Sequence, residues 1–302
     1  MEIKSFKSFK EIWNDFPPLS DQLKNHKIYL AHLSHAENEP DELLIEHVEL
    51  VVKYALKLIR AHHLESVLNE LINHILKEGF SEDYDAKIGN YVKKIFLGAI
   101  IFHDYGKVNE NFQIDKMKNP NPHFKKPNLT NGIKTYHSGL SAFLFIHFFL
   151  KDIQKAFSEN ERAMYLLNIL VCLFTNSILK HHAAYLDHYI KFGERKDSLK
   201  QYLKLYGFDE ETQFSKLIWD EVDELFLKKL LGDLKKDSQK PFRFSSYFPF
   251  FALMKLNFSL LTASDQYATG DFMSKLKFEE FGTISKGFRK NLFDQFRNNE
   301  KA

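Results

Sequence analysis

The sequence predicts an all-α protein. Apolar residues recur three and four positions apart along most of the chain, which is the spacing that places them on one face of an α-helix. Alternation of apolar and polar positions with β-branched residues, the mark of a strand, is hard to find. The 302 residues, 44% of them hydrophobic, suffice for one large domain or two small ones. We therefore expect helices packed around one core, with the 30 Phe residues supplying aromatic bulk.

Three segments in the first third of the chain show the helical spacing most clearly. They cover residues 48–59, 64–75 and 92–103, and the last of them ends at His103. Further helices are predicted over residues 137–150, 160–182, 197–206, 212–231, 247–268 and 284–297.

Breaker residues and charge divide the chain. A long loop rich in Lys and Asn is predicted over residues 118–135, where it could flank a substrate cleft; its markers are Pro120, Pro122, Pro127 and Gly132. We predict that residues 1–275 form one domain, in which the more charged segment 191–245 is a peripheral helical insertion. Residues 276–302 are predicted to form a C-terminal helix or a connector.

Charge, cysteine content and hydropathy limit the function classes. The formal net charge is only +2, so contact with nucleic acid would need a local basic patch. Cys172 is the only cysteine, which excludes a disulfide framework or a thiolate zinc site and fits a reducing cytoplasm. The first residues contain no apolar signal segment. The apolar run 163–179 is shorter than a typical membrane span, so we interpret it as a buried helix and expect a cytoplasmic protein without membrane contact.

The strongest local feature is the pair His103 and Asp104, which stands in the sequence IFHDYGK. A neutral His offers one nitrogen to a cation, and an ionised Asp offers up to two oxygens, one for each of two cations. The apolar helix before the pair would hold it in place, and Gly106 would release the chain from the helix.

Other potential ligands accompany this pair, each of them beside an apolar helical stretch: His47, His137, His181, His182 and Asp265. Polar groups at such positions are costly to bury unless they have partners, and a shared metal centre would satisfy them all. The remaining histidines are interpreted as surface or locally hydrogen-bonded residues, with His32 and His123 as candidates for substrate contact. They are His26, His32, His35, His62, His63, His74, His123, His147 and His188.

The order of these motifs resembles the HD superfamily of metal-dependent phosphohydrolases. More narrowly, it resembles the HD nuclease domain of the CRISPR-associated type I nuclease-helicase. The resemblance runs from about residue 28 to residue 269, and its matching residues are His47, His103, Asp104, Gly106, Lys107, His137, Ser138, His181, His182 and Asp265. Phe112 and Gln113 also fit the pattern of this branch, whereas Ser264 stands where the family usually has Ala.

The resemblance implies an HD-domain helical bundle around a dinuclear metal site. One metal would be held by His47, His103, Asp104 and Asp265, and the other by Asp104, His137, His181 and His182, so that Asp104 bridges them. This nitrogen-rich set suits Fe, Mn, Co or Ni better than Mg, which prefers oxygen ligands, while Zn also fits the ligand types.

The chemistry implied is hydrolysis of a phosphodiester. Two metals about 3.5–4 Å apart lower the pKa of a bridging water, and the hydroxide attacks phosphorus in line. Asp104 is catalytic in this scheme, and Lys107 is the candidate that neutralises or orients the phosphate. Ser138 and Ser264 are further candidates for contact with a ligand or the substrate.

The resemblance also implies partners. The chain lacks a P-loop motif, so the helicase of the family is expected on a separate polypeptide or in a longer chain. The Cascade surveillance complex would then select the target. The leading hypothesis is a metal-dependent nuclease of single-stranded DNA in type I CRISPR interference, an antiviral defence. The alternative is an HD phosphohydrolase of nucleotides or cyclic nucleotides with a closed pocket. A third hypothesis is a non-enzymatic helical module whose His-Asp pair is vestigial.

Overall fold

The architecture comes from a computed structural model, which describes residues 5–17, 19–22, 26–34, 39–80, 84–124, 135, 137–182 and 245–275. These residues are mostly helical and include one two-stranded sheet, which confirms the predicted all-α class. The helices predicted over 197–206, 212–231 and 284–297 lie outside the described residues. The predicted insertion 191–245 also lies outside them, apart from residue 245. The same holds for the segment 276–302 and for most of the loop 118–135.

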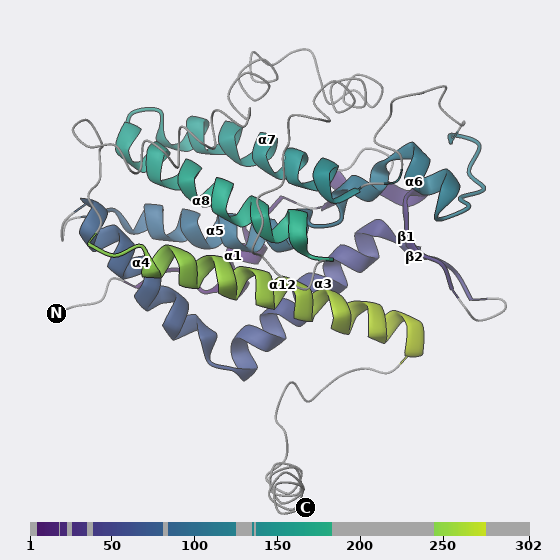
Figure 1. Cartoon of the computed structure of the whole chain (residues 1–302), viewed down its shortest axis with the longest axis horizontal. Helices are drawn as coiled ribbons and strands as arrows, with labels where there is room; N and C mark the ends of the chain where they lie inside the picture. Colours follow the sequence, from purple (N-terminus) through teal and green to yellow (C-terminus); the bar gives the residue numbers. More distant parts are fainter. Residues whose placement is uncertain are drawn as a thin grey trace, which may run out of the picture.

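The described helices, labelled as in Figure 1, begin and end as follows: α1 Phe9–Asn14, α2 Leu19–Gln22, α3 Leu44–Ala61, α4 Leu64–Phe80, α5 Ala86–Phe102, α6 Glu110–Asp115, α7 His137–Phe157, α8 Glu161–Lys180 and α12 Phe248–Ser274. Two short 3-10 helices are η1 His26–Ile28 and η2 Tyr105–Val108. The six helices that the apolar spacing predicted within these residues are all present. Most extend beyond their predicted bounds, because the spacing detects the buried face and not the helix ends.

The long helices pack into one bundle, and their contacts run between segments far apart in the sequence. Helix α7 packs along α8, α8 also contacts α5 and α12, and α12 lies along α3 (Figure 1). Helix α5 contacts α3, α7, α8 and α12, so it runs through the middle of the bundle. This arrangement brings the end of α5 close to the first turn of α3 and to the second half of α12.

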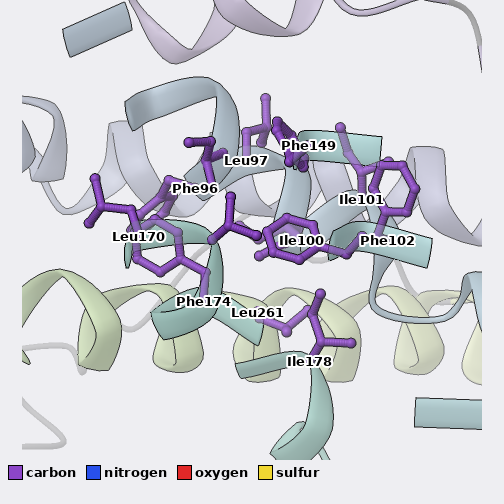
Figure 2. Packing of buried hydrophobic residues seen from close by; sticks show 14 of the residues in the cluster. Phe96, Leu97, Ile100, Ile101, Phe102, Phe149, Leu170, Phe174, Ile178 and Leu261 are labelled. Atoms are coloured by element: carbon purple, nitrogen blue, oxygen red, sulfur yellow. The ribbon is translucent and has the colours of Figure 1, made fainter. Parts of the chain in front are cut away.

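The core around α5 is built largely from aromatic and branched apolar side chains (Figure 2). The ring of Phe96 packs edge-on against that of Phe174 of α8, with the two ring centroids 5.4 Å apart. The centroid of Phe96 also lies 5.5 Å from that of Phe9 of α1. Phe149 of α7 and Ile100 are fully buried in the same core. The Phe residues therefore supply packing bulk, as the composition predicted, and they fix the helix ends that carry the polar residues.

Helix α8 is long and apolar enough to cross a membrane by length and composition alone. Most of its apolar stretch is instead buried inside the protein, where it contacts α5, α7 and α12. This agrees with the prediction that the apolar run 163–179 is a buried helix of the core.

A small hairpin covers one end of the bundle. Strand β1, Leu30–His32, pairs antiparallel with β2, Glu42–Leu43, so that His32 stands opposite Glu42. The buried Gln113 of α6 holds β1 in place: its side chain accepts a hydrogen bond from Leu30 N at 3.0 Å and donates to Leu30 O at 2.9 Å. The same amide donates to Lys107 O at 2.7 Å, which ties the hairpin to η2.

Candidate metal centre

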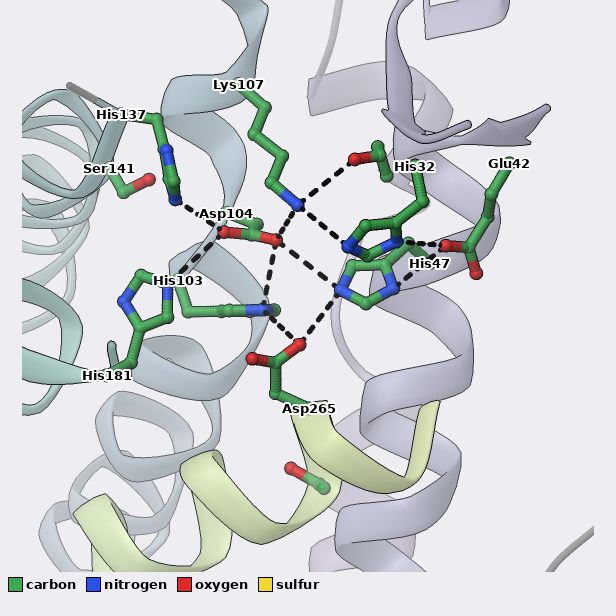
Figure 3. Close-up of polar contacts among 12 residues, drawn as sticks. His32, Glu42, His47, His103, Asp104, Lys107, His137, Ser141, His181 and Asp265 are labelled. Atoms are coloured by element: carbon green, nitrogen blue, oxygen red, sulfur yellow. Dashed lines mark hydrogen bonds and ion pairs between the residues drawn. The ribbon is translucent and has the colours of Figure 1, made fainter. Parts of the chain in front are cut away.

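Five helices bring their polar residues to one point at the end of the bundle (Figure 3). His103 is the C-cap of α5 and His181 the C-cap of α8. His137 is the first residue of α7, His47 lies in the first turn and a half of α3, and Asp265 lies in α12. Helix ends leave backbone groups unpaired and accessible, so they suit the placement of polar side chains beside an apolar core.

Asp104 lies at the centre of this cluster and is 1% exposed. Its Oδ1 atom lies 3.2 Å from His137 Nε2 and 3.4 Å from His181 Nε2. Its Oδ2 atom lies 3.4 Å from His47 Nε2 and 3.5 Å from His103 Nε2. The two oxygens of one carboxylate therefore face two separate sets of histidines.

The first ligand group consists of His47, His103, Asp104 and Asp265, whose donor atoms all lie within 4.8 Å of one another. Asp265 Oδ1 closes the group at 3.2 Å from His47 Nε2 and 3.7 Å from His103 Nε2. Ligands about 2.0–2.2 Å from a cation are about 3–3.5 Å from one another in tetrahedral or octahedral geometry. The spacing of this group therefore fits a bound cation.

The second ligand group consists of Asp104, His137, His181 and His182 and meets the same distance criterion. The Nε2 atoms of His137 and His182 are 2.9 Å apart. His181 is buried, whereas His182 is exposed, so this group is accessible from solvent on one side. The adjacent residues His181 and His182 both reach the cluster because α8 ends there.

Several donor atoms of the two groups are buried without a hydrogen-bond partner among the described residues. They are His47 Nε2, His103 Nε2, His181 Nε2 and Asp104 Oδ1. Buried polar atoms are normally satisfied, and an unsatisfied one costs free energy. A cation in each group would satisfy these atoms, so the residues present fit metal ions.

Two of the rings are oriented for ligation by the backbone. The Nδ1 of His103 lies 2.8 Å from Ile100 O, and the Nδ1 of His181 lies 2.6 Å from Ile178 O. These carbonyl groups at helix C-termini have no partner within the helix and accept the Nδ1–H. The Nε2 of each ring then keeps its lone pair and faces Asp104.

The protonation states also suit cation binding. Burial disfavours the charged form of Asp104, but Lys107 and the surrounding imidazoles outweigh it and hold the pKa well below its usual range. Burial similarly opposes ionisation of Asp265, yet His103 and His47 lower its pKa. Burial lowers the pKa of His137, which favours its neutral, ligating form. Both carboxylates are therefore anionic at neutral pH.

His47 differs from the other rings in its protonation. Burial disfavours its charged form, but the carboxylates of Asp104, Asp265 and Glu42 outweigh burial and raise its pKa to about 10. A cation in the first ligand group would replace the proton on Nε2, because a nitrogen cannot bind both.

Lys107 is 4% exposed and its ammonium group has three neighbours that accept hydrogen bonds. Its Nζ lies 2.7 Å from Asp104 Oδ2, 3.3 Å from Ala31 O and 3.3 Å from His32 Nε2. Lys107 therefore supplies a buried positive charge directly beside the carboxylate that the two groups share. Its predicted contact with a phosphate stays a prediction.

The two serines predicted to contact ligand or substrate are buried. Ser138 is 5% exposed in the first turn of α7. Ser264 is fully buried, and its hydroxyl donates to Leu261 O of its own helix at 3.0 Å. No described contact joins either residue to the cluster, and their predicted roles stay predictions.

Gly106 brings the His-Asp turn against α7. A Cβ atom at this position would lie 1.9 Å from His137 O, so no larger residue fits without a shift of the backbone. Gly106 N also donates to the buried Ser141 Oγ at 2.7 Å. The sequence indicated Gly106 as the residue that ends the helix, whereas the structure shows that it permits a close approach between η2 and α7.

Sequence reasoning missed Glu42, which is 4% exposed and contacts two histidines. The one available signal was its position shortly before the first turn of α3. His32 is locally hydrogen-bonded through its contact with Glu42, as predicted. His62, His63, His74 and His123 are exposed, also as predicted, whereas His35 and His188 lie outside the described residues.

Comparison with known proteins identifies no relative: no family model, no curated protein and no solved structure matches this chain. The geometry of the two ligand groups and the order of the motifs are therefore the observations that bear on function.

Proposed function

We propose that this protein is a metal-dependent phosphodiesterase that hydrolyses single-stranded DNA. The observation that carries the proposal is the placement of Asp104, whose Oδ1 faces His137 and His181 and whose Oδ2 faces His47 and His103. A carboxylate shared between two cations is typical of sites that cut phosphate esters. The residues that would hold the two ions are His47, His103, Asp104, His137, His181, His182 and Asp265.

The ligand chemistry favours divalent transition metals. Imidazole nitrogens dominate both groups, which suits Fe, Mn, Co or Ni, whereas Mg and Zn are the alternatives. When bound, two such ions would activate a water molecule and withdraw charge from the phosphate oxygens.

The side chains of this protein would prepare the site for that reaction. Asp104 fixes both groups relative to each other, and the buried ammonium of Lys107 offsets part of the negative charge of Asp104 and Asp265. The exposed position of His182 supports an approach of the substrate from the side of the second group.

The choice of DNA and the biological setting rest on the order of motifs. It resembles the HD nuclease domain of the type I CRISPR nuclease-helicase, which supports single-stranded DNA as substrate, a helicase and the Cascade complex as partners, antiviral defence as the role, and the cytoplasm as the location. Nucleotides and cyclic nucleotides are the competing substrates, since the same two groups would serve their hydrolysis.

The test measures metal content and substrate together. The purified protein is loaded with Mn, Co, Ni or Mg and incubated with single-stranded DNA, duplex DNA and a panel of nucleotides and cyclic nucleotides. We expect two ions per chain and degradation of single strands, lost in Asp104→Ala. The matched control is Asp115→Ala, which removes an exposed carboxylate of α6 and should retain activity.

Two outcomes would overturn the proposal. Turnover of a nucleotide while DNA stays intact would reassign the substrate. Full activity of Asp104→Ala would remove the central residue from the mechanism.

A further inference from the structure

The histidines of the first ligand group obtain their orientation in different ways. His103 follows the last turn of α5, where the Ile100 carbonyl accepts its Nδ1–H. His47 lies near the start of α3, and carbonyl groups there are engaged by the hydrogen bonds of the helix itself. His47 therefore needs an acceptor from outside its own helix.

Glu42 stands where that acceptor is needed. Its Oε2 lies 3.2 Å from His47 Nδ1, on the side of the ring opposite to Asp104 and Asp265 (Figure 3). The Nδ1 atom makes no well-directed hydrogen bond to any described residue as the ring stands, Glu42 is its near carboxylate, and Glu42 is 4% exposed. A small rotation of the ring would align the N–H with the carboxylate.

We infer that Glu42 is a positioning residue for the first ligand group, an inference that rests on the proposed two-metal site. By accepting the Nδ1–H of His47, the carboxylate selects the tautomer whose Nε2 lone pair points at the cation. Carboxylate partners of this kind also increase the basicity of a ligating imidazole, and their loss weakens metal binding by about 10–100-fold.

The same carboxylate also orients Lys107. Glu42 Oε2 lies 2.6 Å from His32 Nδ1, which fixes that proton on Nδ1. His32 Nε2 is then free to accept from Lys107 Nζ at 3.3 Å, and Lys107 lies 2.7 Å from Asp104 Oδ2. Glu42 thus acts on the first ligand group along two routes, through His47 directly and through His32 and Lys107.

The hairpin explains how this residue reaches the site. His32 and Glu42 are paired across β1 and β2, so their side chains are brought together by the strand register. Gln113 anchors β1 through Leu30, and β2 runs directly into α3. The short strand β2 therefore places the Glu42 carboxylate beside His47.

The other reading of these three side chains is a third cation site formed by His32, Glu42 and His47. It would require both Nδ1 atoms to give up their protons and His47 to bind cations through both nitrogens. Hydrogen bonds from two neutral rings to one carboxylate satisfy all of these groups at lower cost.

The test compares Glu42→Gln and Glu42→Ala with the wild-type protein. Glu46→Gln serves as the control, because it changes an exposed residue of α3 that keeps its capping role as Gln. Affinities for Mn and Co are measured by calorimetry with metal analysis, and thermal unfolding is measured after chelation. To identify which ion is affected, each variant is repeated with His182→Ala, which weakens the second group alone.

We expect both Glu42 variants to lose affinity for one of two ions by about 10–100-fold, with the other ion unaffected. The same loss of affinity should appear in the double variants that also carry His182→Ala, which assigns the loss to the first group. Unchanged unfolding of the chelated Glu42→Gln protein would show that the effect is on the ligand and not on folding.

The outcomes separate this inference from the proposed function. Wild-type affinity for both ions in Glu42→Gln and Glu42→Ala would overturn the role of Glu42 while leaving the nuclease proposal standing. Three ions per chain, with one lost in His32→Ala, would replace it by the third cation site. Two ions without any cleavage of DNA would overturn the proposed substrate, and the role of Glu42 would still be decided by the affinities.

Discussion

The two ligand groups share Asp104 but differ in how firmly the protein holds their other members. In the first group His47 and His103 are fully buried, and the partly accessible Asp265 contacts both of them from α12. In the second group only His181 is buried to the same degree, whereas His137 is partly accessible and His182 is exposed. The clearest difference is the exposed His182, so the second group is the more open to solvent, and we expect a substrate of the proposed reaction to approach from that side.

The largest effect should come from the residue that both groups share. Asp104→Asn should lower the affinity for both ions by more than the roughly 10–100-fold that is typical when a residue hydrogen-bonded to a metal ligand is lost. It also leaves the buried ammonium of Lys107 without its carboxylate, which should lower the free energy of unfolding by about 3–5 kcal/mol. Metal analysis and chemical unfolding of the chelated protein measure the two effects.

A second substitution separates these two effects. Adding Lys107→Met to Asp104→Asn removes the unpaired charge. The double variant should therefore regain stability but should not regain affinity for either ion. If the double variant is as unstable as Asp104→Asn, the pair between Asp104 and Lys107 does not contribute as the geometry indicates.

His182→Ala should distinguish the two groups. Because His182 is exposed, its loss should change stability by no more than about 0.5 kcal/mol, but the second ion should bind more weakly. The exposed His62→Ala should change neither property. Equal loss of both ions in His182→Ala would show that the two groups are not independently held.

The pH dependence of the chelated protein should also differ between the groups. Burial depresses the pKa of His137, so the stability linked to its neutral ring is present above the ordinary pKa of about 6.5 and is lost as the pH falls. The pKa of His47 is raised to about 10, so the stability from its charged ring is full below about 6.5 and is lost as the pH rises through about 10.

Thermal unfolding measured between pH 5 and pH 10 follows both the loss of stability at acid pH and the loss at alkaline pH. His137→Gln should reduce the loss of stability at acid pH, to which His182 also contributes because burial lowers its pKa to about 4, and should leave the alkaline loss unchanged. His47→Gln should reduce the alkaline loss and leave the acid one unchanged. Identical profiles for the two variants would contradict the assignment of these protonation states.

The smallest effect is expected at Ser264, beside the ligand Asp265. Its hydroxyl donates only to Leu261 O of its own helix, so Ser264→Ala should leave metal affinity, cleavage rate and stability close to the wild-type values. A large loss of cleavage with intact metal binding would instead support the substrate contact that the sequence suggested.

Much of this site was predictable because ligand chemistry is a property of residue type. The spacing of apolar residues located the helices, and the polar residues at their ends were few enough to be recognised as a set. His103 and His181 illustrate this, because each directly follows a long apolar helix. The structure brings all seven predicted ligands together.

Other features could not be predicted, because they depend on contacts across the fold. Glu42 precedes α3 in a segment without periodicity, and nothing in its neighbours indicates that it would be buried against two histidines. The burial of Lys107 depends on β1, which Gln113 holds from another part of the chain. The sequence predicted Lys107 as a substrate contact and did not indicate that its charge lies against Asp104.

The sequence by itself therefore determined the all-α class, the buried course of α8 and the residues that could bind metal, because periodicity and side-chain chemistry are local properties. The tertiary structure decided how those residues are used. Packing of α12 on α3 and of α7 on α8 set which histidines face each oxygen of Asp104. The close approach at Gly106 and the position of Glu42 follow from the same packing, since both depend on atoms that only the folded chain brings together.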